Sequence, residues 1–163
     1  MRWGDGLKVI FLDIDGVLCT PLSFRLNRLL RLPAERQRFD PVSLYWLRRV
    51  VRATGAEVVL SSSWRDGLLM MDDPFFRAAM RNLFQRLRKN GTPLTEVTPM
   101  LPRGGKGADI AAWLGCNPCE YVVLDDNDCF SEYPEVAAHW ILIPDSRGLR
   151  RKEALAAIKR LRE

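Results

Sequence analysis

The chain has 163 residues, 47% of them hydrophobic and 28% charged, which is typical of an ordinary globular protein with one buried core. Its net charge of +5, from 25 Lys and Arg against 20 Asp and Glu, favours anionic partners, although arginines on solvated helix faces would give the same total. No apolar stretch reaches membrane-spanning length and the N-terminus lacks a secretory pattern, so we expect a cytoplasmic protein with no membrane partner.

The first predicted element is a buried strand over residues 7–14, which is apolar on both faces. Two carboxylates, Asp13 and Asp15, lie at its end, and burying an ionised carboxylate is costly unless a cation or hydrogen-bond donors compensate it. We therefore expect the strand to end at Asp13 in a polar site. Gly16 would then let the backbone turn sharply after the strand.

A small helical flap is predicted over residues 19–39, where leucines alternate with arginines. Asp40 followed by Pro41 is typical of a helix N-terminus, and this helix continues to Gly55. Residues 56–64 are the next predicted strand and its loop.

Helices and strands continue to alternate in the second half of the chain. Asp73 and Pro74 open a helix that Gly91 closes. The remaining predicted elements are strands at 93–98, 120–126 and 139–143, a helix at 108–114 stopped by Gly115, and a C-terminal helix from Arg150. This alternation predicts an α/β fold: a three-layer sandwich with a central parallel sheet of about five strands, in a single domain over residues 1–163.

Polar clusters mark one edge of this predicted sheet. Three of them stand at the carboxyl ends of strands, and a glycine-lysine loop opens the helix after the remaining strand. In open α/β sheets, ligands bind at this edge. The clusters are Asp13 with Asp15, Ser61 with Ser62, Gly104–Lys106, and Asp125 with Asp126.

Carboxylates gathered at one place repel one another, and a divalent cation relieves that repulsion. Oxygen ligands without histidine or thiolate indicate Mg²⁺ rather than zinc. Ser61 and Ser62 can donate hydrogen bonds to phosphate oxygens, and Lys106 adds positive charge at a helix N-terminus. The set predicts phosphoryl transfer, with Asp13 attacking to form an aspartyl-phosphate and Asp15 handling the proton.

These motifs resemble those of the haloacid-dehalogenase-like (HAD) superfamily of phosphohydrolases. "FLDIDGVL", the serine after the second strand, Lys106 and "VVLDDND" follow the family's order within residues 11–130. "DIDGVL", "LSSSWR", "RGGKG" and "VLDD" are most similar to the HAD domains of Swiss-Army-knife RNA repair proteins. The resemblance implies a Rossmann-like core, a phosphatase acting through an aspartyl-phosphate, and Mg²⁺ as cofactor.

For the acidic residues, the resemblance implies that Asp13 is the nucleophile and that Asp15 is the acid/base. The main-chain carbonyl of Asp15 would touch Mg²⁺. Asp126 would bind the metal directly, with Asp125 assisting, and Asp13 would complete the metal site.

For the phosphate-binding residues, the resemblance implies Ser61, with Ser62 as a competing alignment because three serines run together. Lys106 would stabilise the phosphate, with Arg103 as the alternative. Arg65 follows the serines and is a candidate to hold a second phosphate; a surface ion pair is its alternative role.

No large cap domain fits the chain, because the insertions at 19–39 and 66–92 are short and the second is mostly one helix. An open site suits a bulky or macromolecular substrate. We therefore expect phosphorylated nucleic-acid ends, as in RNA repair, or nucleotides. The flap arginines within 25–38, together with Arg65, would follow a phosphodiester backbone.

Several alternatives stay open or are disfavoured. A small-metabolite phosphatase and a non-catalytic phosphate- or nucleic-acid-binding HAD module both remain. A phospho-acceptor receiver module also gathers aspartates around Mg²⁺, but it carries the acidic pair on its first strand, whereas here the pair comes last.

Two further residue groups are interpreted as structural. Cys116 and Cys119 form a C-x-x-C that follows a helix and precedes a strand, opposite to a thioredoxin-like motif, so we interpret them as loop cysteines. The tryptophans are interpreted as core or near-core residues rather than base-stacking platforms; they are Trp46, Trp64, Trp113 and Trp140.

Overall fold

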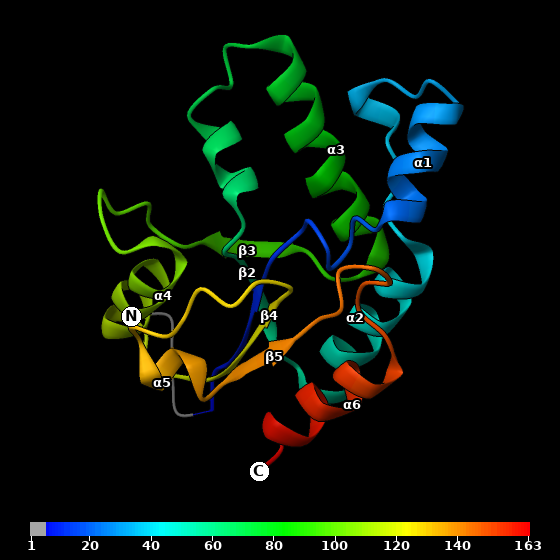
Figure 1. Ribbon diagram of the computed structural model, residues 1–163. Helices are drawn as coiled ribbons and strands as arrows, with labels where there is room; N and C mark the ends of the chain where they lie inside the picture. Colours follow the sequence, from blue (N-terminus) through cyan, green and yellow to red (C-terminus); the bar gives the residue numbers. More distant parts are fainter. Residues whose placement is uncertain (1–5) are drawn as a thin grey trace.

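The computed structural model describes residues 6–163; residues 1–5, which bear on the predicted lack of a secretory leader, lie outside the described residues. A five-stranded, all-parallel sheet in the order β3-β2-β1-β4-β5 forms its centre (Figure 1). The strands are β1 (Lys8–Leu12), β2 (Glu57–Leu60), β3 (Leu94–Val97), β4 (Glu120–Asp125) and β5 (Trp140–Leu142). The predicted α/β sandwich with a parallel sheet is confirmed.

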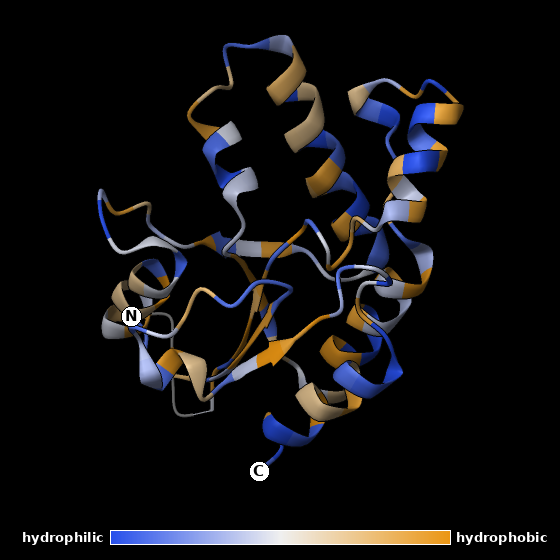
Figure 2. Cartoon of the chain, viewed as in Figure 1, coloured by the Kyte–Doolittle hydropathy of each residue, from blue (hydrophilic) through white to orange (hydrophobic). Residues whose placement is uncertain are grey.

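Helices cover both faces of the sheet, and alternate strand residues face the two resulting cores. Ile10 and Leu12 of β1 pack in one core with α2 (Pro41–Thr54), α6 (Arg151–Arg160) and the later turns of α3 (Pro74–Asn90). Val9 and Phe11 pack in the other core with α4 (Gly105–Cys116) and the short α5 (Pro134–Ala137). The central strands β1, β2 and β4 are correspondingly hydrophobic over most of their length (Figure 2), as expected for parallel strands covered on both sides, whereas the edge strand β3 is more polar.

Helix termini follow the capping signals of the sequence. The Asp40 side chain accepts a hydrogen bond from the Ser43 amide at the start of α2, and Gly55 ends that helix with φ +71°. Asp73 accepts from the Phe75 amide at the start of α3, and Gly91 ends it with φ +78°. Glycine adopts this left-handed conformation without strain, so the two glycines predicted both helix C-termini correctly.

The boundaries of α4 differ from those predicted. The helix begins at Gly105 and continues through Gly115 to Cys116, so Gly115 does not stop it. Gly115 keeps a helical backbone, and glycine inside a helix only weakens it. The four-residue α5 was not predicted at all.

Two short projections rise beyond the carboxyl edge of the sheet in place of a cap domain (Figure 1). The first, within the predicted flap, consists of α1 (Pro21–Leu29) and the 3₁₀ helix η1 (Ala34–Arg36). The second consists of the 3₁₀ helix η2 (Ser63–Leu68) and α3. The two are linked by a hydrogen bond at 2.9 Å, which the Asn82 side-chain amide of α3 donates to the carbonyl of Gln37, directly after η1. Within residues 6–163, no helix has both the length and the apolar character needed to cross a membrane.

Arg65 of η2 links three other parts of the protein. Its side chain is buried, and its guanidinium forms an ion pair with Asp109 of α4 and a hydrogen bond with the Thr98 hydroxyl after β3. It also donates to the Ser61 carbonyl at 3.3 Å. The alternative of a surface ion pair is therefore wrong, because the pair is buried, and both terminal nitrogens contact protein groups instead of being left free for the expected phosphate. Its two terminal nitrogens link β2, β3 and α4, whereas the buried Nε has no hydrogen-bond partner among the described residues.

We predict that Asp109→Asn lowers the free energy of unfolding by about 3–5 kcal/mol, because it leaves the buried Arg65 charge without its partner. Denaturant titration followed by circular dichroism measures this. Glu163→Gln is the matched control: it breaks an exposed pair with Lys159 and should cost less than about 1 kcal/mol. Equal effects of the two substitutions would contradict the buried ion pair.

Candidate active site

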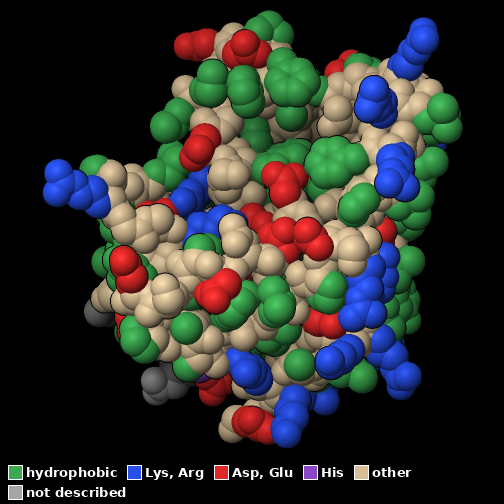
Figure 3. All heavy atoms as spheres, in the orientation of Figure 1, with side chains coloured by type: hydrophobic (Ala, Val, Ile, Leu, Met, Phe, Trp, Pro, Cys, Tyr) green, Lys and Arg blue, Asp and Glu red, His purple; other side chains and the backbone are tan. Residues whose placement is uncertain are grey.

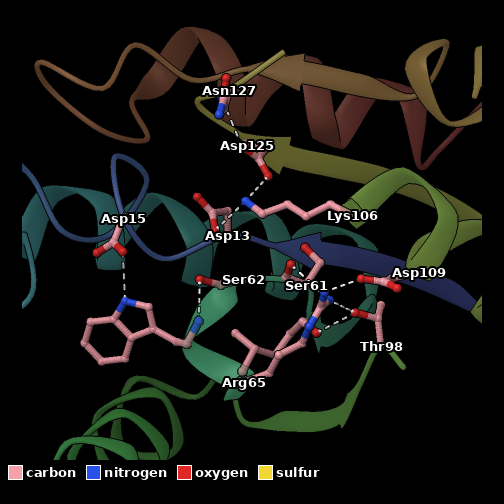
Figure 4. Close-up of polar contacts among 12 residues, drawn as sticks. Asp13, Asp15, Ser61, Ser62, Arg65, Thr98, Lys106, Asp109, Asp125 and Asn127 are labelled. Atoms are coloured by element: carbon pink, nitrogen blue, oxygen red, sulfur yellow. Dashed lines mark hydrogen bonds and ion pairs between the residues drawn. The ribbon is translucent and has the colours of Figure 1, made fainter. Parts of the chain in front are cut away.

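The site forms where the central strands end. Asp13 follows β1, and its amide donates to the Leu124 carbonyl of β4 at 3.0 Å. Ser61 follows β2, and its amide donates to the Leu12 carbonyl at 3.0 Å. Asp125 is the last residue of β4. These sheet bonds bring together residues from three distant parts of the sequence (Figure 4).

Lys106 lies between two of the carboxylates. It extends from the first turn of α4, and its Nζ is 3.0 Å from Asp13 Oδ1 and 2.8 Å from Asp125 Oδ2. Burial lowers the pKa of Lys106, but the charges of Asp13 and Asp125 outweigh this and hold the pKa above its usual value. The side chain therefore stays protonated at neutral pH. Arg103, the alternative for this role, is exposed, and no ion pair of its side chain is found within residues 6–163.

Three carboxylates form a compact acidic cluster. Asp13, Asp125 and Asp126 each offer one oxygen, and these oxygens all lie within 4.8 Å of one another. Burial and the charges of Asp13 and Asp125 raise the pKa of Asp126 to about 6. Burial and the charge of Asp13 also raise the pKa of Asp125, despite the contact with Lys106. The cluster thus has more negative charge than Lys106 balances, and its oxygen donors suit Mg²⁺.

Gly16 permits the close approach of Asp126 to the end of β1. It has φ +76°, and a Cβ at this position would lie 2.1 Å from Asp126 Oδ2. Any other residue would both strain the turn and displace a carboxylate of the cluster. The structure agrees with the sharp turn predicted at this glycine.

Asp15 points away from the acidic cluster (Figure 4). Its Oδ2 accepts a hydrogen bond from the Trp64 indole N–H at 3.0 Å. Desolvation by the surrounding groups raises the pKa of Asp15 above its usual value; the Trp64 hydrogen bond opposes this and the charge of Asp13 adds to it. Asp15 is accordingly a carboxyl that retains a proton more readily than a free aspartate.

Trp64 has a role that the sequence interpretation missed. It is half-buried and packs against Phe39 with ring centroids 5.9 Å apart, in keeping with a near-core residue, but it also orients Asp15. Its place directly after the serines was the available signal.

The serines separate into different roles. The Ser61 hydroxyl is buried and has no hydrogen-bond partner among the described residues, whereas Ser62 Oγ accepts from the Trp64 amide at 3.3 Å. A buried polar atom without a partner is energetically unfavourable, and a ligand oxygen would satisfy it. This favours Ser61 over Ser62 as the phosphate-binding serine.

A cleft of about 400 Å³ opens above these groups. Besides Asp13, Asp15, Lys106 and Asp126, its walls include three residues that sequence reasoning missed: Ser63, Asn127 and Asp145. Each follows a strand at the carboxyl edge, so the rule that located Asp13 applied to them too. The main-chain N–H of Asn127 donates a hydrogen bond to Asp125 Oδ1 at 2.9 Å and holds that carboxylate in place.

The cysteines take no part in this cleft. Cys116 and Cys119 are free thiols and do not line it. Burial raises the pKa of Cys119 to about 11, which disfavours the reactive thiolate.

Comparison with known proteins identifies the family. No curated protein and no solved structure matches the chain in these comparisons. A family model described as "HAD domain in Swiss Army Knife RNA repair proteins" matches residues 9–154, from β1 to the first turn of α6 and across all four motifs. Because this match covers well over half of the sequence and agrees with the Rossmann-like sheet, the chain belongs to this family of HAD domains.

Proposed function

We propose that this protein is a Mg²⁺-dependent phosphatase that forms an aspartyl-phosphate at Asp13. Membership of the HAD family indicates a phosphatase-type hydrolase. The observation that carries the finer proposal is the meeting of Asp13, Lys106 and the acidic pair beside the unpartnered Ser61 hydroxyl. A nucleophile, an anion-binding lysine and a hydrogen-bond donor then surround one position at the end of β1.

Substrate binding would use the groups that have capacity left for an anion. The Ser61 hydroxyl donates to one phosphate oxygen, and the Lys106 ammonium interacts with another while keeping Asp13 in place. Asp13, Asp125 and Asp126 would hold the Mg²⁺, which neutralises charge on the phosphate and on the carboxylates.

The first chemical step transfers the phosphoryl group to the protein. A carboxylate oxygen of Asp13 bonds to phosphorus while the bond from phosphorus to the leaving oxygen breaks, and its electron pair stays on that oxygen. Asp15 gives its proton to this oxygen, so the leaving group departs as a neutral alcohol. The raised pKa of Asp15 and its separation from the acidic cluster support this role.

The second step regenerates the protein. Asp15, now a carboxylate, takes a proton from a water molecule whose oxygen attacks phosphorus. The bond between phosphorus and Asp13 then breaks, and inorganic phosphate leaves. Trp64 keeps Asp15 in position during both proton transfers through its indole N–H.

For the substrate, we propose a phosphate at the end of a nucleic acid. Arginines of the first projection support this, because Arg25 and Arg28 of α1 and Arg31 just after it line a shallow hollow of about 530 Å³. They are exposed and have room to bind successive phosphates. Arg65 no longer contributes to this surface, so the proposal depends on the flap arginines alone.

Mg²⁺ and protonation should compete to stabilise the acidic cluster. Because the folded-state pKa of Asp126, about 6, lies above the ordinary value of 3.8, the folded protein binds more protons than the unfolded chain between these values. Its carboxylate therefore lowers stability as the pH rises through this window. We expect Asp126→Asn to melt at a higher temperature than the parent in chelator above about pH 6, with the difference vanishing below about pH 4.

Thermal melts with and without Mg²⁺ check this prediction. Mg²⁺ should raise the melting temperature of the parent at neutral pH and raise that of Asp126→Asn much less. Asp145→Asn, which alters a cleft carboxylate outside the cluster, should keep the Mg²⁺ response. A parent that shows no Mg²⁺ response at neutral pH would rule out the metal site.

Substitution of the nucleophile and of the lysine should separate their roles. We expect hydrolysis of an aryl phosphate to need Mg²⁺, to be lost in Asp13→Asn, and to fall about a hundredfold or more in Lys106→Ala. Arg103→Ala is the matched control and should change kcat/KM less than about threefold. If Asp13→Asn retains activity within about tenfold of the parent, Asp13 is not the nucleophile. If Arg103→Ala loses more activity than Lys106→Ala, Arg103 rather than Lys106 stabilises the phosphate.

Salt dependence should reveal a nucleic-acid substrate. We expect higher kcat/KM for a terminal phosphate on an oligonucleotide than for a mononucleotide, with an advantage that shrinks as salt rises, because backbone binding releases counterions. Arg25→Gln and Arg28→Gln should reduce the advantage, whereas Arg48→Gln on α2 should not. Equal, salt-independent efficiency on both substrates would decide for a small-metabolite phosphatase.

A further inference from the structure

A second, largely apolar pocket adjoins the polar cleft. It has a volume of about 620 Å³ and lies between the two projections. Phe24 of α1 forms one wall, and Phe75 and Phe76 of α3 form the other, with Trp64 and Met70 between them. Figure 3 shows hydrophobic side chains on both sides of this hollow, above a group of acidic side chains.

Three of the apolar side chains that form the walls are exposed and belong to neither hydrophobic core. Phe24 is 53% exposed, Phe75 59% and Met70 46%. They come from three separate segments and face one hollow, so they are not scattered surface residues. Convergent exposed aromatic side chains around a concave space are typical of a ligand site.

The pocket begins where the leaving group must lie. Asp15 and Ser63 line both the polar cleft and the apolar pocket. In the proposed mechanism Asp15 protonates the leaving oxygen, so the body of the leaving alcohol extends toward Asp15 and away from Asp13 and Lys106. Trp64 strengthens this link, because its N–H binds Asp15 while its side chain lines the pocket.

We propose that the pocket binds the nucleobase of the leaving nucleoside, so that the substrates are nucleoside phosphates or phosphorylated oligonucleotide ends. This rests on the proposed phosphatase function and names the substrate class of the same site. A nucleobase has flat apolar faces that stack on Phe24, Phe75 and Trp64, as well as a polar edge. Gln37 and Asp66 also line the pocket and offer an amide and a carboxylate to that edge.

Other leaving groups fit the walls less well. A sugar or polyol would place hydroxyl groups against phenyl rings and Met70, where they lose hydrogen bonds to water. A long alkyl chain would leave the Asp66 carboxylate desolvated against hydrocarbon. The pairing of aromatic walls with two polar side chains therefore points to an aromatic heterocycle.

The test compares substrates with and without a base. For adenosine 5′-monophosphate against ribose 5-phosphate, we expect kcat/KM at least about fivefold higher with the base, as stacking on aromatic side chains predicts. Phe24→Ala and Phe75→Ala should each bring this ratio toward one. Leu22→Ala on α1 and Leu69→Ala beside Met70 remove exposed apolar side chains outside the pocket, and should keep the parent ratio.

A second pair of substrates distinguishes the sources of the base. An oligonucleotide with a 5′-phosphate is compared with the same strand whose terminal nucleotide is abasic. Base dependence with mononucleotides alone indicates free nucleotides, and base dependence with oligonucleotides indicates strand ends; either supports the proposal. A ratio near one in both pairs, or equal losses in Phe24→Ala and Leu22→Ala, would overturn it.

Binding of adenosine separates failure of this inference from failure of the proposed function. Adenosine carries no phosphate, so calorimetric titration of the parent protein needs no turnover. Binding that Phe24→Ala weakens at least about fivefold supports the pocket even if no phosphate ester is hydrolysed. Hydrolysis of phosphate esters without base discrimination or adenosine binding overturns the pocket and leaves the phosphatase intact.

Discussion

The contact of Lys106 with Asp13 and Asp125 is the interaction on which the site depends. Parallel strands place their carboxyl ends at one edge, and the order β2-β1-β4 therefore puts the aspartates of β1 and β4 side by side. Their like charges repel, and Lys106 offsets only part of that repulsion because Asp126 adds a third carboxylate. The hydrophobic cores on both faces of the sheet hold the strands together against this local cost.

Lys106 reaches the cluster because α4 is anchored by the buried pair of Arg65 and Asp109. Asp109 lies on α4 three residues after Lys106, so the ion pair fixes the same helical turn that carries the lysine. Gly107 also lets this turn approach Tyr133, since a Cβ there would lie 2.5 Å from the ring. The polar link and the close packing together set the position of the ammonium group.

Local sequence signals predicted the strands, most helix boundaries and the candidate nucleophile, because each depends on neighbouring residues. The Asp40 and Asp73 caps and the turn at Gly16 are of this kind. Arg65 was misinterpreted because its partner Asp109 is 44 residues away, and no local pattern reports a contact made only when β2, β3 and α4 pack. The continuation of α4 through Gly115 is not explained by packing at that residue, because Gly115 is exposed and a Cβ there would meet nothing within 4 Å.

The five consecutive residues from Ser61 to Arg65 contact different parts of the protein. Ser61 follows β2 and keeps a buried hydroxyl that has no hydrogen-bond partner among the described residues, and Ser62 caps η2. In a 3₁₀ helix successive side chains point about 120° apart, because there are about three residues per turn. Ser63 therefore faces the cleft, Trp64 faces Asp15 and the apolar pocket, and Arg65 faces the interior. A regular strand would alternate between two faces only, so the tight helix is what allows one short segment to contact the polar cleft, Asp15 and the protein interior.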